Sequence, residues 1–287
     1  MIACAAFLMV PEPPEPPVVN ADEQAIRERM ADWAVRDAEQ WTGDEGDLTI
    51  PWSEAEGHLA IVIDDVGREL DLFDKLLALR FRLSFGVLPG AIFAEGVQQR
   101  LQADDRRPRE ILLHLPMEPL DPKAMGGVES DEVFLLASDS KAELQAKARA
   151  AIERVPSAVG VNNHMGSRLT ADRKAMAALM PILEEQGLYF LDSRTHPKTV
   201  AANTAESAGV PTISRKVFLD HDPSPEAIRA SLEEAVSYAR EQPTVAIAHP
   251  SVEVIEVLRD ELPRLHTQGI AVYSVSQLIA GQRADPE

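Results

Sequence analysis

The chain has 287 residues, which is enough for one large folded domain plus an extension. Hydrophobic residues make up 45% and charged residues 26%, which excludes a chain disordered throughout and a membrane protein with several spans. The net charge of −19, from 47 acidic and 28 basic side chains, would repel phosphate groups, so nucleic acid is excluded as an expected partner.

Residues 1–57 are expected to form an N-terminal extension. It starts with an apolar run at 2–9 that is too short to span a membrane, so no membrane-spanning segment is expected in this chain. Residues 11–17 contain five prolines and form an extended spacer, and 21–41 have the apolar spacing of one amphipathic helix. An acidic linker, residues 42–57, follows. An apolar start and a proline-rich spacer favour a tethered protein of the cell envelope, with the cytoplasm as the alternative.

From residue 58 to residue 287, short apolar runs alternate with longer segments of helical periodicity. This pattern is typical of parallel strands joined by crossover helices. It predicts an α/β fold, a (β/α) barrel, with a doubly wound open sheet as the alternative. The expected strands are residues 59–63, 83–87, 110–115, 158–162, 188–191, 244–248 and 270–273. The expected helices include 140–154, 172–186 and 226–241, with Ser138, Thr170 and Ser224 as N-caps and Gly187 and Gly269 just after helix ends.

Polar side chains follow five of the seven expected strands. In parallel α/β folds the ligand site lies at the carboxyl ends of the strands, so these side chains are candidates for one shared site. They are Asp64 and Asp65, then His114, then Asn162, Asn163 and His164, then Asp192, Ser193 and Arg194, and finally His249.

Asp64 and Asp65 are adjacent carboxylates that repel each other unless they share a cation or a proton. A helix cap near Arg68 would need only one of them. His114 and His164 each stand where a strand meets a loop, and each alone is more often a buried, hydrogen-bonded group. Together, two histidines and one carboxylate make an open three-ligand site that suits zinc or a similar divalent ion.

Five further residues are candidates for catalysis or for contacts to the substrate or the metal ligands. His249 is placed to act as a general acid or to hydrogen-bond a neighbouring loop. Asp192 is placed to orient a histidine, to bind sugar hydroxyls, or to cap the loop that follows it. Glu118, Asn163 and Arg194 complete the set. The sequence contains no phosphate-binding loop, CxxC pair, HExxH helix or GxSxG elbow, so metal-assisted hydrolysis is the reaction class that remains.

Six segments together resemble the divergent polysaccharide deacetylase family of bacterial proteins. They are IVIDDVG (61–67), HLPMEP (114–119), GVNNHMGSR (160–168), FLDSRT (190–195), FLD (218–220) and AIAHP (246–250). That family is similar to the polysaccharide deacetylases, which have a distorted seven-stranded barrel and use a divalent metal to remove acetyl groups from N-acetylated sugars. The resemblance therefore implies a distorted (β/α)7 barrel, a divalent metal such as zinc and a carbohydrate substrate. The expected location in the cell envelope or periplasm comes from the apolar start and the proline-rich spacer instead.

The resemblance also implies roles for single residues. Asp64 matches the general base, Asp65 the metal-binding aspartate, His114 the first metal histidine and His249 the histidine that protonates the leaving amine. In the better-known deacetylases the second metal histidine lies four residues after the first, where this chain has Glu118. His164 is therefore expected to supply that ligand from the next strand.

The expected function is metal-dependent deacetylation of an N-acetylated saccharide. One alternative is a catalytically inactive, deacetylase-like module of the cell envelope that binds a glycan or a protein. Another is a metal hydrolase that acts on a different amide or ester.

Overall fold

The computed structural model describes residues 46–103, 107–127 and 132–284. The predicted apolar run, proline-rich spacer and amphipathic helix of the extension lie outside these residues. The described part of the chain has no helix that is both long and apolar enough to cross a membrane. Residues 46–56 lie against the folded domain: Asp47 forms an ion pair with Arg109, and the Ile50 carbonyl accepts a 2.9 Å hydrogen bond from the Tyr273 hydroxyl.

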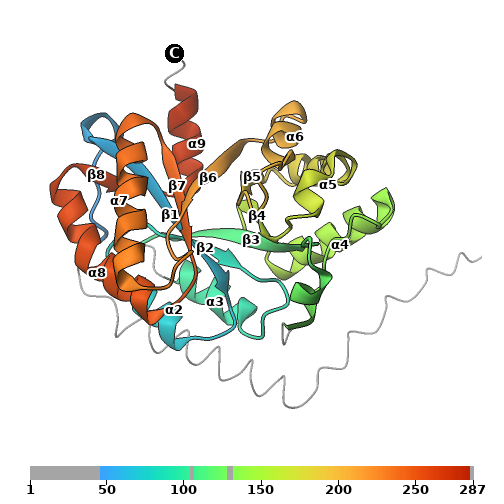
Figure 1. Cartoon of the computed structure of the whole chain (residues 1–287), viewed down its shortest axis with the longest axis horizontal. Coiled ribbons are helices and arrows are strands. Elements are labelled where there is room, and N and C mark those ends of the chain that lie inside the picture. The colour runs from blue at the N-terminus through green and yellow to red at the C-terminus, as the bar shows by residue number, and fades with distance from the viewer. Residues whose placement is uncertain (1–45, 104–106, 128–131, 285–287) are drawn as a thin grey trace, which may run out of the picture.

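Strands and helices alternate along the described chain, with the strands in the middle of the molecule and helices around them (Figure 1). The strands are β1 (Gly57–Val66), β2 (Ser84–Val87), β3 (Glu110–Met117), β4 (Gly160–Met165), β5 (Tyr189–Asp192), β6 (Thr212–Phe218), β7 (Thr244–Ala248) and β8 (Ile270–Val272). The helices are η1 (Trp52–Glu54), α2 (Asp71–Leu77), α3 (Ala94–Gln102), η2 (Pro122–Gly127), α4 (Lys141–Arg154), η3 (Leu169–Ala171), α5 (Arg173–Glu185), α6 (Ala201–Ser207), α7 (Pro225–Glu241), α8 (Val252–Thr267) and α9 (Val275–Ala284).

Strands β1 to β7 close into a parallel barrel, which confirms the predicted fold class. The strands pair in the order β2-β3-β4-β5-β6-β7-β1, and β1 pairs again with β2 to complete the ring. β1 is long enough to pair twice on the same side, with β8 through residues 57–59 and with β2 through residues 62–66. β8 is thus an eighth strand attached to the start of β1.

The number of barrel strands was predicted correctly, but one member of the set was wrong. The run at 270–273 was expected to be a barrel strand, whereas β8 pairs only with the first residues of β1. The seventh barrel strand is β6, which the sequence pattern missed. β6 contains Arg215 and Lys216 in its middle and is only partly buried, so it has no continuous apolar run to mark it.

Two apolar layers lie on opposite faces of the strands and alternate along each one. Ala60 and Val62 of β1 belong to a cluster that includes residues of α9 but none of α2 to α8, so this cluster fills the barrel. Leu59 and Ile61 belong to the cluster that packs against the outer helices. Because strand side chains alternate between faces, the alternation assigns an inward or outward direction to every residue up to the strand ends.

The N-terminal caps of two helices differ from the prediction by two residues. Ser140, not Ser138, caps α4 in a capping box with Glu143, and Asp172, not Thr170, caps α5. Ser224 caps α7 as predicted. Gly187 and Gly269 follow α5 and α8 with φ of 68° and 81°, the left-handed conformation expected after a helix end.

Candidate metal centre and active site

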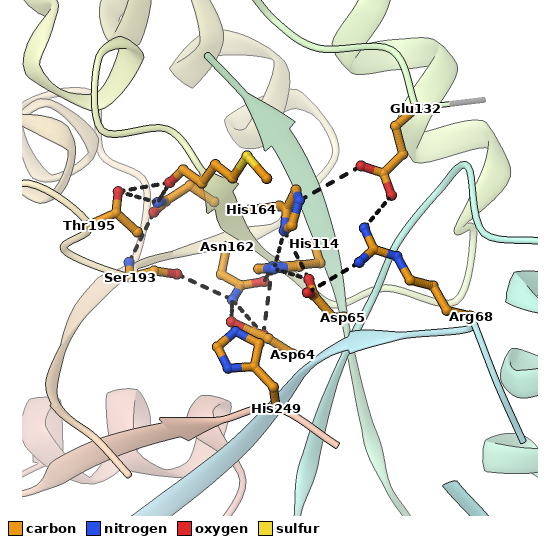
Figure 2. Close-up of polar contacts among 12 residues, drawn as sticks. Asp64, Asp65, Arg68, His114, Glu132, Asn162, His164, Ser193, Thr195 and His249 are labelled. Carbon is orange, nitrogen blue, oxygen red and sulfur yellow. Dashed lines mark hydrogen bonds and ion pairs between the residues drawn. The ribbon is translucent and has the colours of Figure 1, made fainter. Parts of the chain in front are cut away.

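The inward-facing register of the strands brings the candidate residues to one end of the barrel. Extending the barrel-filling alternation to the carboxyl ends selects Asp64 on β1, His114 on β3, Asn162 and His164 on β4, and the residue after β7, His249. Figure 2 shows these five side chains gathered in one cluster. The periodicity that builds the apolar interior therefore also assembles the site.

Asp65 joins this cluster although the alternation would point it outward. Its φ is 57°, in the left-handed region that a non-glycine residue rarely adopts. The pairing of β1 with β2 shifts register between residues 63 and 66, so Asp65 lies in a bulge. Bulges re-aim side chains next to functional sites. The irregular backbone thus lets two successive carboxylates face the same space.

Asp65, His114 and His164 form a compact triad of possible metal ligands. Oδ1 of Asp65 lies 2.8 Å from Nδ1 of His164 and 3.2 Å from Nε2 of His114, and the two histidine nitrogens are 3.2 Å apart. Two ligand atoms at about 2.1 Å from one ion are separated by roughly 3 to 3.4 Å, so these separations are close to those of a metal site.

The hydrogen bonds around the triad also fit a cation. Asn162 donates from Nδ2 to both oxygens of Asp64, at 2.8 and 2.9 Å, so its Oδ1 is the atom that lies 2.9 Å from Nδ1 of His114. That contact requires the His114 proton on Nδ1 and leaves a lone pair on Nε2, inside the triad. Oδ1 of Asp65 is buried and accepts no well-formed hydrogen bond from the described residues. Lone pairs from three side chains therefore converge on one point, which a divalent cation would satisfy.

Asp64 is a buried carboxylate held beside the triad rather than in it. Its Oδ1 lies 3.6 Å from Nδ1 of His114. Burial raises the pKa of Asp64, while the charges of His114 and His249 and the hydrogen bond from Asn162 oppose this rise. The carboxylate also needs Gly86 on β2, because a Cβ atom at that position would lie 2.3 Å from its Oδ1.

His249 approaches the same space from the end of β7 and is anchored by Asp220. Oδ2 of Asp220 accepts hydrogen bonds from the backbone N–H of His249 at 2.7 Å and from its Nδ1 at 3.1 Å. Burial lowers the pKa of His249, but the hydrogen bond and charge of Asp220, with Asp64 and Asp65 behind it, raise the pKa to about 9. The side chain is 45% exposed, so a ligand at the carboxyl ends of the strands can reach it.

The other predicted site residues are occupied with contacts between loops and strands. Glu118 accepts a 2.7 Å hydrogen bond from the Ala137 N–H and forms an ion pair with Arg168 at 3.2 Å. Asn163 faces away from Asn162 and ties β4 to the loop after β5 by accepting from the Ser193 N–H at 2.9 Å.

Asp192 and Arg194 both occupy positions that point away from the barrel interior. Asp192 lies on the outward face of β5, where its oxygens accept from the Arg194 N–H at 2.8 Å and the Thr199 hydroxyl at 2.9 Å. Arg194 is exposed and has a φ of 48°. None of the four residues Glu118, Asn163, Asp192 and Arg194 belongs to the triad, and their proposed contacts to a substrate stay predictions.

Three residues of the site were not singled out from the sequence: Arg68, Glu132 and Asp220. Asn162 was named among the polar residues at the strand ends, but Asn163 was chosen for the supporting role, although the alternation along β4 gives Asn162 the same direction as His164. Asp220 lies beyond β6, the strand that the sequence pattern missed. Arg68 and Glu132 lie in loops, and no local signal relates their positions.

Fold and site together define an α/β-barrel protein with a candidate divalent-metal centre at the carboxyl ends of its strands. The model of the divergent polysaccharide deacetylase family matches residues 61–279, which contain all of these side chains. The chain belongs to the divergent polysaccharide deacetylase family.

Two relatives support this assignment, and one solved structure shares the fold. The chain is 36% identical over 219 residues to an uncharacterized protein of Haemophilus influenzae, covering 76% of this chain and 75% of the relative. It is 35% identical over 230 residues to the uncharacterized protein YibQ of Escherichia coli, covering 80% of this chain and 69% of YibQ. The crystal structure of an uncharacterized protein from Agrobacterium tumefaciens superposes with a TM-score of 0.66 and 24% identity, over 91% of this chain and 98% of that one. This last likeness concerns the fold alone.

Proposed function

We propose that this protein is a metal-dependent hydrolase that removes acetyl groups from an N-acetylated saccharide. One observation carries the proposal: a buried carboxylate, Asp64, and a histidine, His249, lie in one cluster with a metal-type triad of Asp65, His114 and His164. Amide hydrolysis needs a group that activates water and a group that protonates the departing nitrogen. The family and the arrangement of these five side chains both support this reaction.

Asp65, His114 and His164 would hold the ion, and zinc fits a set of two imidazoles and one carboxylate. When bound, a divalent ion would lower the pKa of water and polarise the acetyl carbonyl. The three residues leave positions open for water and substrate. His114 is kept in the required tautomer by Asn162.

Asp64 is the proposed general base. Both of its oxygens accept from Nδ2 of Asn162, so the carboxylate has a fixed orientation at the edge of the triad. Burial raises its pKa, which makes it a better proton acceptor than an exposed aspartate. Asp64 would take the proton from the attacking water.

His249 is the proposed general acid. Its pKa of about 9 keeps the imidazole protonated at neutral pH, and its Nδ1–H is directed to Asp220. The Nε2–H is then available to the leaving nitrogen of the sugar. Without protonation this nitrogen is a poor leaving group, so the proton transfer completes bond cleavage.

Asp220→Asn is expected to move the alkaline limit of activity to lower pH. His249 acts only when protonated, so activity should fall as the pH rises through about 9. Removing the carboxylate of Asp220 would lower the pKa of His249 towards its ordinary value of about 6.5. The pH profile of kcat in the wild type and the variant would measure the shift.

Asp222→Asn is the matched control, because Asp222 is exposed and its hydrogen bonds are to Ser224. The control should keep the wild-type alkaline limit. An unchanged limit in Asp220→Asn would remove His249 from the role of acid.

The proposed function is tested by acetate release from N-acetylated oligosaccharides. The full chain, purified without a histidine tag and supplied with zinc, should release acetate. Acetate release should stop after the metal is chelated and should recover when zinc is restored. If no acetate is released with zinc, cobalt or manganese, and the chain binds glycan saturably, the hydrolase proposal is wrong and the chain is a binding module. A location in the cell envelope remains part of the proposal.

A further inference from the structure

Glu132 is a buried carboxylate beside the triad, in the loop between β3 and α4. Its side chain is 1% exposed. Oε1 accepts a 3.0 Å hydrogen bond from Nη2 of Arg68, whereas Oε2 has no hydrogen-bond partner within the described chain. Nε2 of His164 lies 3.8 Å from Oε2.

Nε2 of His164 is also buried and without a hydrogen-bond partner among the described residues. A buried polar atom without a partner is costly and calls for an explanation. Here a possible donor and an acceptor are both unpaired and face each other (Figure 2). The two atoms are complementary, because a carboxylate oxygen only accepts hydrogen bonds and an imidazole N–H donates one.

The direction of the proton on His164 follows from the triad. Nδ1 of His164 lies 2.8 Å from Oδ1 of Asp65 and 3.2 Å from Nε2 of His114, so Nδ1 is the ring atom inside the triad. A neutral histidine that offers a lone pair at Nδ1 carries its proton on Nε2. That proton points to the side on which Glu132 lies.

Glu132 also completes a closed ring of four side chains. Asp65 contacts His164, His164 faces Glu132, Glu132 binds Arg68 through its other oxygen, and Nη1 of Arg68 lies 3.5 Å from Oδ2 of Asp65. Figure 2 shows this ring. The positive charge of Arg68 therefore compensates the negative charges of Asp65 and Glu132. Oε2 of Glu132 stays available to His164.

We propose that Glu132 is a positioning residue whose Oε2, now 3.8 Å from Nε2 of His164, closes on it to accept a hydrogen bond from the Nε2–H and thereby fixes Nδ1 as the metal-binding atom. This inference rests on the metal site of the proposed function. His164 lies on β4 and His114 on β3. Asn162 orients His114, so His164 needs a hydrogen-bond acceptor of its own. Asn162 orients His114 with an amide oxygen, and Glu132 orients His164 with a carboxylate, which also makes the ring a stronger donor.

The test compares zinc affinity and the His164 tautomer in the full chain purified without a histidine tag. Glu132→Gln keeps the shape of the side chain and Glu132→Ala removes it. Zinc affinity, measured by competition with a chromophoric chelator, should fall by about 10-fold to 100-fold in both variants. Long-range proton–nitrogen NMR of the zinc-loaded wild type should show the His164 proton on Nε2, and this signal should change in both variants.

Glu185→Gln is the matched control, because it also takes one carboxylate from an arginine pair, with Arg149 on the surface. The control should keep wild-type affinity. Circular dichroism identifies a variant that has lost its fold, and either variant that folds decides the result. Unchanged affinity and tautomer in a folded Glu132 variant would overturn this inference alone, whereas a wild type that binds no zinc would overturn the proposed function with it.

Discussion

Replacing His114 by alanine is expected to abolish stoichiometric metal binding. The wild type should carry about one equivalent of zinc, and His114→Ala should carry none, because Asp65 and His164 alone supply two ligand atoms. Loss of the hydrogen-bond partner of a metal ligand lowers metal affinity by about 10-fold to 100-fold. Loss of the ligand itself should lower metal affinity further. Elemental analysis of the full chain, purified without a histidine tag, measures the content directly.

His164→Ala should behave in the same way, since its Nδ1 is the third corner of the triad. His221→Ala is the control, because His221 is exposed and lies in the loop after β6. One equivalent of metal in both triad variants would place the ion elsewhere. Loss of metal in the control as well would indicate that the assay reports protein damage rather than ligand loss.

Asp64→Asn is expected to separate catalysis from metal binding. The variant should keep its metal, because Asp64 lies outside the triad, and an asparagine oxygen can still accept from Nδ2 of Asn162. An amide cannot accept a proton from water at neutral pH, so kcat should fall by roughly 100-fold to 10,000-fold, the usual contribution of a general base. Acetate release and metal content are measured on the same sample.

Asp260→Asn serves as control, since Asp260 is exposed and pairs with Arg259 on α8. It should retain wild-type kcat. Wild-type turnover in Asp64→Asn would assign proton abstraction to another group. If glycan binding survives and the wild type forms no product either, the chain is a binding module.

Most of the fold could be predicted from the sequence because the strands are buried on both faces. Six of the seven barrel strands overlap short apolar runs, and the spacing of these runs with helical segments indicated parallel pairing. β6 escaped because Arg215 and Lys216 interrupt it, and the run at 270–273 was mistaken for a barrel strand because β8 is equally apolar. Sequence shows how apolar a strand is, but not which neighbour it pairs with.

The site was readable where it follows the strands and unreadable where it depends on loops. Asp64, Asp65, His114, His164 and His249 follow strands whose ends meet at one edge, and the structure brings them together. The choice of Asn163 instead of Asn162 reflects a one-residue step in register, which reverses the direction of a side chain. Arg68 and Glu132 are 64 positions apart, and only the folded chain shows that they meet.

Gly86 gives strand β2 a constraint that does not come from its own packing. A Cβ atom there would overlap Oδ1 of Asp64, so even the smallest side chain would force the carboxylate away from Asn162. β2 is fully buried, and burial alone would favour a larger residue at this position. Attempts to stabilise the barrel by filling β2 with β-branched residues would therefore be limited at this point by the chemistry of a neighbouring strand.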